Sequence, residues 1–373
     1  MTRNTAVVKA LEAHSPISCG VAGKRVLVLI NCDQSGGVEH FSEDLIEELA
    51  RRGAIIQRDH LYPNSDLPHL AKLCAIVGGA WRIVRYCPDI TITFQPTSSL
   101  VASFFARMNG CPIRVVHQSN LLSETHPVVA YLDYVAGSLG FYTVVIANSR
   151  TTEKVFSSYP SSYRRRLRRI DHGIQIGIST HQRADTLAVF SVPDDGPIIL
   201  CCARLVEQKC LDILISALPH ISGARLVLAG TGPDKDRLLR FSEMLGVRER
   251  VHLVGNVARC DVFALCSACD VFAFPSSWET FGLAVVEAAM HGVPVVCRDL
   301  EVMREVMSAD GCLCVGVFVK GSHPPTWACA INETLDSPLA KERAVKFAPI
   351  VRHKYSKKHM MGHYRALFDE LMR

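Results

Sequence analysis

The chain has 373 residues, 49% of them hydrophobic and 21% charged, with a formal net charge of +5. This size and composition suit two globular domains with large buried cores, and they exclude an intrinsically disordered chain. No apolar run approaches the roughly 20 residues that span a bilayer, and residues 1–15 lack the apolar core of a secretory signal, so we expect a cytoplasmic protein.

Short apolar runs typical of buried strands alternate with helix-forming stretches along the chain. Such runs lie at residues 26–30, 54–57, 90–94, 113–117 and 143–147 in the first half, and at 198–202, 225–229, 251–255, 271–274 and 294–297 in the second. Strands that alternate with helices indicate parallel sheets built from βαβ units. We therefore expect an α/β protein of two Rossmann-like domains whose parallel sheets face an interdomain cleft.

The two predicted domains cover residues 1–175 and 176–354. Residues 173–197, between the two sets of strands, are polar and irregular and end in proline, which is typical of a linker. Residues 355–373 are amphipathic and predict a helix that could pack back on the first domain.

Ser35-Gly36-Gly37 follows the first predicted strand and opens the first predicted helix. Glycines at such a position let backbone N–H groups approach a phosphate at a helix N-terminus. A tight turn fits these residues equally well. The spacing is not the GxGxxG fingerprint of dinucleotide-binding proteins, which disfavours a dehydrogenase.

The positive charge is concentrated in the first half of the chain, where residues 1–171 carry 19 Lys and Arg against 14 Asp and Glu. The segment 163–170 supplies five of these cations: Arg164, Arg165, Arg166, Arg168 and Arg169. One interpretation is a solvated loop or pairing with nearby acids. The other is a patch for an anionic partner, such as an acidic acceptor or the inner face of a membrane, where each basic residue contributes about 1 kcal/mol.

The loop after the strand at 198–202 carries Arg204 and Lys209. The planar fork of an arginine and the point charge of a lysine together suit a pyrophosphate. Two exposed cations without a ligand are the simpler interpretation.

The loop after the strand at 225–229 contains Gly230 and Gly232, and Asp234 and Asp236 follow it. The two acids resemble a DxD metal motif. They fall in the first turn of a predicted helix, however, where acids interact favourably with the helix dipole, so we expect no metal there.

Fifteen cysteines are scattered along the chain, many of them in apolar runs. This pattern indicates reduced core thiols rather than a disulfide framework. Cys266 and Cys269 form a CxxC pair, but no second pair or histidines at zinc spacing accompany it, so we expect a structural role.

Glu279 and Glu287 stand eight residues apart in the otherwise apolar segment 275–294. A helix is expected from about residue 281, and Glu287 falls within its apolar stripe, where a carboxylate is costly to bury unless something binds it. Glu279 follows a predicted strand, at the end where open parallel sheets bind ligands. Either glutamate alone is more simply structural, but the pair in this setting favours a ligand site.

The segments SGGVEHF, VVHQSN, VIANS, IDHGI, ARLVEQK, LAGTGP and PSSWETFGLAVVEAAMHGVPVV occur in this order along the chain. In this order they resemble the GT-B fold retaining glycosyltransferases of family 4, whose signature is a Glu-x7-Glu pair. The resemblance covers nearly the whole chain. It implies transfer of a sugar from a UDP- or GDP-sugar donor to a glycan, lipid-linked or small-molecule acceptor, with retention of configuration. It also implies work in cell-surface polysaccharide or glycolipid synthesis, without a metal or other cofactor.

The resemblance assigns a role to each motif residue in the second domain. Glu279 would bind hydroxyls of the donor sugar, Glu287 would accept hydrogen bonds from the nucleotide ribose, and Arg204 and Lys209 would stabilise the departing diphosphate. The remaining donor-binding positions are Gly230 and the backbone N–H groups of Phe281, Gly282 and Leu283.

In the first domain, the resemblance implies that Gly36 and Gly37 approach the donor phosphates and that His117 lines the sugar pocket. The alternative for His117 is a strand-end histidine bonded to backbone. Three positions depart from the usual pattern: Ala203 and Cys210 replace glycines beside the motif arginine and lysine, and His172 replaces an asparagine. The alanine is tolerable if its φ is negative, whereas Cys210 could stiffen or shift the Lys209 loop.

Two further functions remain open from the residues. One is a sugar-nucleotide hydrolase or epimerase on the same scaffold, which would release free sugar without an acceptor. The other is a non-catalytic sugar-nucleotide-binding subunit, which the full set of charged donor residues disfavours.

Overall fold

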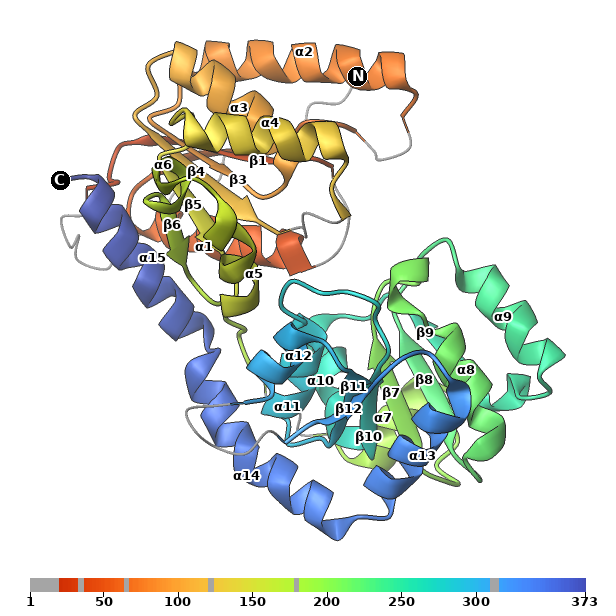
Figure 1. The fold of residues 1–373 in the computed structure, drawn as a ribbon. Helices are drawn as coiled ribbons and strands as arrows, with labels where there is room; N and C mark the ends of the chain where they lie inside the picture. Colours follow the sequence, from red (N-terminus) through yellow and green to blue (C-terminus); the bar gives the residue numbers. More distant parts are fainter. Residues whose placement is uncertain (1–19, 33–36, 64–66, 120–123, 178–180, 309–314) are drawn as a thin grey trace. The chain divides into compact units, whose positions relative to one another are not determined.

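The structure is a computed structural model that describes residues 20–32, 37–63, 67–119, 124–177, 181–308 and 315–373. The chain divides into two compact units: unit 1 comprises Met1–His172 with Lys357–Arg373, and unit 2 comprises Gly173–Ser356. Each unit holds a six-stranded parallel sheet covered by helices (Figure 1). The predicted fold class, α/β with Rossmann-like sheets, is confirmed for each unit.

Unit 1 has the strand order β2-β1-β3-β4-β5-β6. Its strands are β1 (Arg25–Ile30), β2 (Ile55–His60), β3 (Ile90–Thr93), β4 (Ile113–Gln118), β5 (Val144–Ala147) and β6 (Leu167–Arg169). Its helices are α1 (Gly37–Arg51), α2 (His69–Tyr86), α3 (Pro96–Met108), α4 (Pro127–Ser138), α5 (Arg150–Val155), η2 (Phe156–Ser158), α6 (Ser161–Arg164) and α15 (Lys357–Leu371).

The sheet of unit 1 buries alternate side chains of each strand against different helices. On β1, Val26 and Val28 join a core cluster with α1 and α15, whereas Leu27 and Leu29 join a cluster with α2 and α3. Figure 1 accordingly shows α1 and α15 on one face of the sheet and α2, α3 and α4 on the other. The last helix therefore shares one face of the sheet with α1, although it follows unit 2 in the sequence.

Unit 2 has the strand order β12-β11-β10-β7-β8-β9. Its strands are β7 (Ile198–Cys202), β8 (Arg225–Ala229), β9 (Val251–Gly255), β10 (Val271–Phe274), β11 (Val295–Arg298) and β12 (Val317–Val319). Its helices are α7 (Arg183–Val189), η3 (Glu207–Lys209), α8 (Asp212–Ala217), η4 (Leu218–His220), α9 (Lys235–Met244), η5 (Arg248–Arg250), α10 (Arg259–Ala268), α11 (Leu283–Met290), α12 (Glu301–Val306), α13 (Pro324–Leu335) and α14 (Pro338–Lys354).

The predicted irregular linker at residues 173–197 is wrong in part. Helix α7 lies inside this segment and buries Leu187 in the core of unit 2. The segment looked irregular because the helix is short and a polar Pro-Asp-Asp-Gly turn follows it soon after. Close to its start, Ile174 pairs with Ser356, and the Ile174 N–H donates to the carbonyl of Tyr355 at 2.8 Å. The two crossings of the chain between the units thus lie side by side.

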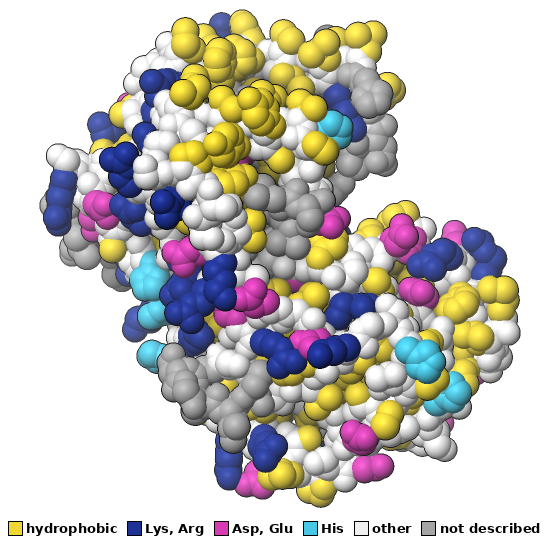
Figure 2. Space-filling view, viewed as in Figure 1, with side chains coloured by type: hydrophobic (Ala, Val, Ile, Leu, Met, Phe, Trp, Pro, Cys, Tyr) yellow, Lys and Arg dark blue, Asp and Glu magenta, His cyan; other side chains and the backbone are white. Residues whose placement is uncertain are grey.

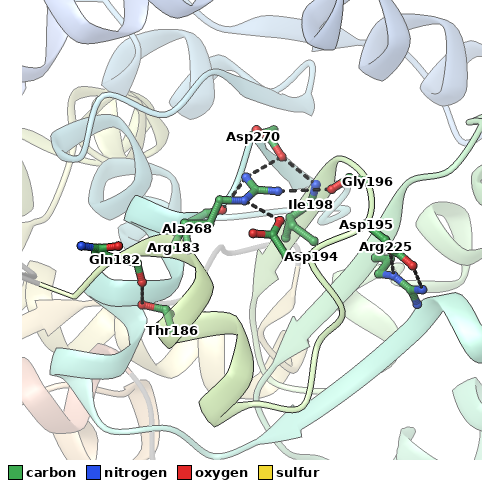
Figure 3. Close-up of polar contacts among 10 residues, drawn as sticks. All are labelled: Gln182, Arg183, Thr186, Asp194, Asp195, Gly196, Ile198, Arg225, Ala268 and Asp270. Atoms are coloured by element: carbon green, nitrogen blue, oxygen red, sulfur yellow. Dashed lines mark hydrogen bonds and ion pairs between the residues drawn. The ribbon is translucent and has the colours of Figure 1, made fainter.

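A network of charges holds the amino ends of the strands in unit 2 (Figure 3). Arg183 on α7 donates to Asp194 at 2.8 Å, and to Asp270 and the carbonyl of Ala268 at 2.9 Å each. The same oxygen of Asp270, Oδ2, also accepts from the N–H of Ile198 at 2.8 Å, where β7 begins. This network joins α7, β7 and the turn before β10, so it has a structural role.

Within the described ranges, none of the helices is both long enough and apolar enough to cross a membrane.

Candidate functional site

The loops that follow β7, β8 and β10 in unit 2 meet at the carboxyl end of the sheet. Gly230 ends its strand with φ +147°, and a Cβ atom there would overlap the carbonyl oxygen of Ala203. A Cβ on Gly232 would likewise overlap the carbonyl of Leu205. The glycines therefore let the two loops pack backbone to backbone, which gives Gly230 a structural reason whether or not it contacts a donor.

Lys209 and Glu279 form an ion pair at this end of the sheet. Each side chain is 13% exposed, and the lysine ammonium lies 5.3 Å from the ring centre of Phe274, the last residue of β10. The two loops are locked together at Gln208, whose side-chain amide donates to the carbonyl of Trp278 at 2.8 Å. The structure thus brings together two residues that the sequence separates by 70 positions.

Arg204 lies one residue beyond Ala203 at the end of β7, and its side chain is exposed. Cys210 ends the η3 turn with φ +48°, in the left-handed region that favours glycine. Among the described residues, the others with positive φ that are not glycine are Cys87 and Ser191, so Ala203 has the negative φ that lets it replace a glycine. Of the two residues that replace a glycine of the family pattern, Cys210 therefore has the unfavourable backbone conformation, and Ala203 does not.

Gly282 allows the chain to enter α11 directly from the loop that carries Glu279. It has φ +85°, and a Cβ atom there would overlap the Sδ–Cε end of Met303. Phe281 turns into the core, 2% exposed, with its ring edge-on to Tyr355 at 5.3 Å. Leu283 is the first residue of the helix. The side chains on either side of Gly282 therefore hold the N-terminus of α11 at the same edge as the Lys209–Glu279 pair.

Glu287 lies on α11 within its apolar stripe, as the sequence predicts, and its side chain is 18% exposed. The Arg259 guanidinium, at the start of α10, lies 3.8 Å from its carboxylate. Burial raises the pKa of Glu287 to about 7, and the charge of Arg259 opposes this only in part. A carboxylate in this setting gains from hydrogen-bond donors such as sugar hydroxyls.

The predicted site residues in unit 1 fall at the start of α1 and the end of β4. Gly36 lies outside the described residues, and Gly37 is the exposed first residue of α1. His117 is 5% exposed and stacks on Phe94 with ring centres 4.5 Å apart. It lines a cavity of about 10 Å³ together with Tyr364, His172 and neighbouring side chains.

Both ring nitrogens of His117 are engaged inside unit 1. Nδ1 donates to the carbonyl of Thr93 at 3.0 Å, which leaves Nε2 to accept from the hydroxyl of Tyr364 at 2.9 Å. Burial lowers the pKa of His117 to about 3, so the ring is neutral at ordinary pH. These contacts are those of the alternative interpretation, a strand-end histidine bonded to backbone. Contact with a sugar would require Nε2 to exchange Tyr364 for the ligand.

The two acids of the DxD-like segment lie at the start of α9. Asp234 pairs with Arg237 at 2.8 Å, and Asp236 lies in the first turn of α9. Cys269 donates from Sγ to the carbonyl of Cys266 at 3.3 Å. In the part of the chain that the structure describes, no group of three or more His, Cys, Asp and Glu is placed to hold a metal ion.

The five arginines near residue 167 do not form a uniform patch, and two of them, Arg168 and Arg169, lie within β6. Arg168 faces Glu370 at 3.5 Å, and Arg169 faces Glu153 and Asp171 at 3.6 and 3.3 Å. Arg166 donates to the carbonyl of Ser162. Arg164 and Arg165 are the exposed members that face no acid in the described ion pairs.

Sequence reasoning missed Arg259 and Tyr364, the partners of Glu287 and His117. Arg259 opens α10 as one charged residue among many, and nothing in its spacing signals a partner on α11. Tyr364 reaches His117 across 247 positions. The helix pattern of residues 355–373 is the one sequence signal that could have brought Tyr364 to the core of unit 1.

Comparison with known proteins shows which family and which solved structures the chain resembles. Residues 182–351, nearly all of unit 2, match the family described as Glycosyl transferases group 1. The chain is 32% identical over 208 residues to a D-inositol 3-phosphate glycosyltransferase of Mycolicibacterium smegmatis, a match that covers 54% of this chain and 47% of that protein. It is 28% identical over 168 residues to an alpha-D-kanosaminyltransferase of Streptomyces kanamyceticus, over 44% of this chain and 43% of that protein. The chain thus spans about half the length of these curated relatives.

Solved structures extend the likeness to both units. Anabaena HepE in complex with UDP and glucose has a TM-score of 0.77 at 19% identity, covering 93% of this chain and all of that one. WaaG, a glycosyltransferase involved in lipopolysaccharide biosynthesis, has a TM-score of 0.73 at 14% identity, covering 92% and 99% of the two chains. At this level of identity the likeness shows the fold, which is GT-B.

Proposed function

We propose that this protein is a glycosyltransferase that moves a sugar from a nucleotide-sugar donor to an acceptor. The observation that carries the proposal is the meeting of the Lys209–Glu279 pair, the N-terminus of α11 and Glu287 at one edge of the sheet in unit 2. Cations, helix N–H groups and a carboxylate are the groups that a diphosphate, a sugar and a ribose need. This edge lies in the segment that matches Glycosyl transferases group 1.

The donor binds, in this proposal, with its diphosphate at Lys209 and Arg204 and at the N–H groups of Phe281, Gly282 and Leu283. Glu287 accepts hydrogen bonds from the ribose, and Glu279 binds hydroxyls of the sugar. A UDP- or GDP-sugar has all of these parts. HepE, which has the same fold, was solved with UDP-glucose, which favours a donor of this class. The roles of Gly36, Gly37, Gly230 and His117 remain predictions.

The ion pair between Lys209 and Glu279 suggests how the donor is received. An arriving diphosphate offers Lys209 a stronger anionic partner, and the exchange frees the Glu279 carboxylate for sugar hydroxyls. When the bond between the anomeric carbon and the phosphate oxygen breaks, charge grows on the leaving diphosphate, next to Lys209 and Arg204. Two fixed cations can supply this stabilisation, so we propose a reaction without a metal.

Retention of configuration and the nature of the acceptor are proposed from the resemblance and from the relatives. Retention is proposed from the resemblance of the Glu-x7-Glu segment. The relatives carry names that refer to D-inositol 3-phosphate, to O-antigen biosynthesis and to transfer of a kanosaminyl group, so they share a sugar-transfer chemistry and differ in their substrates. We propose a glycan, lipid-linked or small-molecule acceptor, with cytoplasmic work in polysaccharide or glycolipid synthesis.

A panel of nucleoside diphosphates and nucleotide sugars in a thermal-shift assay tests the donor site. A ligand at a hundred times its dissociation constant adds roughly 2.7 kcal/mol of stability, which a melting curve detects. A transfer assay with the stabilising donor and pooled glycan and lipid acceptors then tests catalysis. Free sugar without an acceptor product would indicate the hydrolase. Binding without any turnover would indicate the non-catalytic subunit, and no shift with any nucleotide would contradict the donor site.

A further inference from the structure

The outer side of the helix layer of unit 1 exposes many large apolar side chains, which we call the apolar face. Its members are Leu70, Leu73, Val77, Trp81 and Val84 on α2, Phe104 and Met108 on α3, and Val128, Tyr131, Leu132 and Leu139 on or next to α4. Figure 2 shows hydrophobic side chains gathered over this part of unit 1. Apolar surface gathered in this way on a soluble domain usually marks an interaction site.

Helix α2 shows that the apolar face is not a by-product of core packing. Its exposed members recur at helical spacing and form a stripe, from Leu70 at 74% exposure through Val77 at 63% and Trp81 at 62%. Its inward side already packs on the core through Ala80 and Ile83, which are 7% and 1% exposed. Within the described residues, the outer stripe belongs to none of the core clusters of unit 1, which leaves it available to a partner.

The charged side chains at the surface of α2, α3 and α4 are all positive. The acidic residue within α2, α3 and α4 is Asp133, which is 2% exposed and bonded to Tyr142 at 2.8 Å. The cations of these helices are Lys72, Arg82, Arg85 and Arg107. Arg82 pairs with Asp59 on β2, whereas the Arg85 guanidinium lies 5.3 Å from the ring centre of Trp81. Two described acids flank these helices in the sequence: exposed Glu124 just before α4, and Asp89 just after α2, which faces Arg25 at 3.8 Å.

We propose that the apolar face docks on the surface of an anionic lipid bilayer. Aliphatic side chains enter the acyl boundary, Trp81 and Tyr131 suit the headgroup level, and lysine and arginine attract acidic lipids. A second copy of the chain fits less well, because a symmetric contact would set the same cations against each other. A protein partner normally exchanges about ten hydrogen bonds with an interface, and the stripe on α2 offers few polar groups.

The arginines near residue 167 contribute less to membrane docking than the apolar side chains in this proposal. Arg107, at the end of α3, donates to the carbonyl of Gly140 at 2.6 Å, and the guanidinium of Arg166 lies against the same glycine. These arginines therefore border the apolar face where α3 and α4 end. We expect them to strengthen attraction to anionic lipid, with the apolar side chains as the main anchor.

Flotation of the full chain with vesicles tests the docking surface, and it needs no sugar donor, so the result is independent of the proposed glycosyl transfer. The vesicles contain phosphatidylcholine with or without phosphatidylglycerol. We expect binding to the anionic vesicles and about tenfold or greater loss of partitioning for Leu73→Ser/Val77→Ser/Trp81→Ser, since each lost apolar contact removes a large part of a factor of ten. The matched control is Val189→Ser/Met244→Ser/Leu339→Ser, three exposed apolar residues of unit 2 that should leave binding unchanged.

Two further measurements keep the proposal open to refutation. Brominated lipids should quench the fluorescence of the wild type, and Trp81→Phe should abolish this quenching although Trp278 and Trp327 remain. Circular dichroism melting checks that each variant is folded. The proposal is overturned if the wild type does not bind anionic vesicles. It is also overturned if the α2 variant still binds and the change of all five arginines near residue 167 to glutamine abolishes binding. A wild-type dimer that the α2 variant dissociates, without lipid binding, would assign the face to a second copy instead.

Discussion

The two ends of the sheet in unit 2 both carry ion pairs, but they use charge differently. At the amino end, Arg183 donates to two carboxylates and to backbone carbonyls, and Asp270 also accepts from the N–H of Ile198. At the carboxyl end, Lys209 and Glu279 pair with each other beside an aromatic ring. Charged groups that are saturated with backbone hydrogen bonds thus stabilise the fold, whereas an ion pair without such bonds can exchange partners with a ligand.

The largest expected effect that tests this contrast is on turnover. Glu279→Gln should lower turnover by about 10²–10³-fold, the size seen when a positioned polar group is lost from a reaction centre, while nucleoside diphosphate still binds. The free energy of unfolding should change by about 1 kcal/mol or less, because the amide oxygen still accepts from Lys209. Transfer kinetics and a urea melt on one protein preparation give both values. Wild-type turnover would remove Glu279 from the reaction.

Asp270→Ala should show the opposite behaviour at the other end of the sheet. The change removes one of the acceptors of Arg183 and leaves the N–H of Ile198 without its acceptor, which costs about 2–3 kcal/mol of unfolding free energy. Turnover per folded molecule should stay near wild type. Asp195→Ala is the matched control, since its exposed pair with Arg225 should matter much less (Figure 3). A loss of turnover equal to that of Glu279→Gln would end the distinction between the two ends.

Glu287 adds a pH dependence at the carboxyl end. Because the folded protein raises the pKa of Glu287 from 4.5 to about 7, it holds a proton that the unfolded chain has released between these values. Stability should therefore fall as pH rises from about 4.5 to about 7. Glu287→Gln should remove this fall and be up to about 3 kcal/mol more stable than wild type at pH 8, the free energy that corresponds to a pKa rise from 4.5 to about 7.

The same glutamate gives a test of ligand binding. If ribose hydroxyls donate to the ionised carboxylate, nucleotide affinity should rise between pH 6 and pH 8 in the wild type. It should be weak and independent of pH in Glu287→Gln. Calorimetric titrations at several pH values measure this, and an unchanged affinity in the variant would mean that Glu287 does not touch the nucleotide.

The smallest expected effect concerns the turn that carries Lys209. Cys210→Gly should raise the unfolding free energy by about 0.5–1 kcal/mol, because glycine adopts the φ of +48° without the Cβ clash. Cys210→Ala, which keeps the Cβ, should give no such gain. Equal melting of all three proteins would show that this turn relaxes at no cost, and that the carboxyl end is less rigid than its contacts indicate.

Periodicity predicted most of the fold, and the strands that it missed share one property. All ten predicted strands are present. The two that were not foreseen, β6 and β12, are edge strands of three residues each. An edge strand packs little side-chain area, so β6 can be built from Leu-Arg-Arg and leaves no apolar run to detect.

The sequence likewise predicted only part of the candidate site. Lys209, Glu279 and Glu287 could be placed near one another because strand ends of a parallel sheet gather at one edge. The contacts of His117 could not be foreseen, because they depend on a helix that arrives from the far end of the chain. Sequence order predicts neighbours within a βαβ unit and does not predict which distant helix closes a core.

The position of α15 in the sequence also sets the order in which the two units can be completed during synthesis. Unit 2 is continuous from Gly173 to Ser356, so a ribosome has delivered all of it before the last helix of unit 1 is translated. The core of unit 1 includes Met360, Tyr364 and Phe368, and the face of the sheet that α15 shares with α1 stays partly uncovered until these residues emerge. The first unit to be made is thus the last to be finished, and a nascent chain must shield its exposed strands while unit 2 folds.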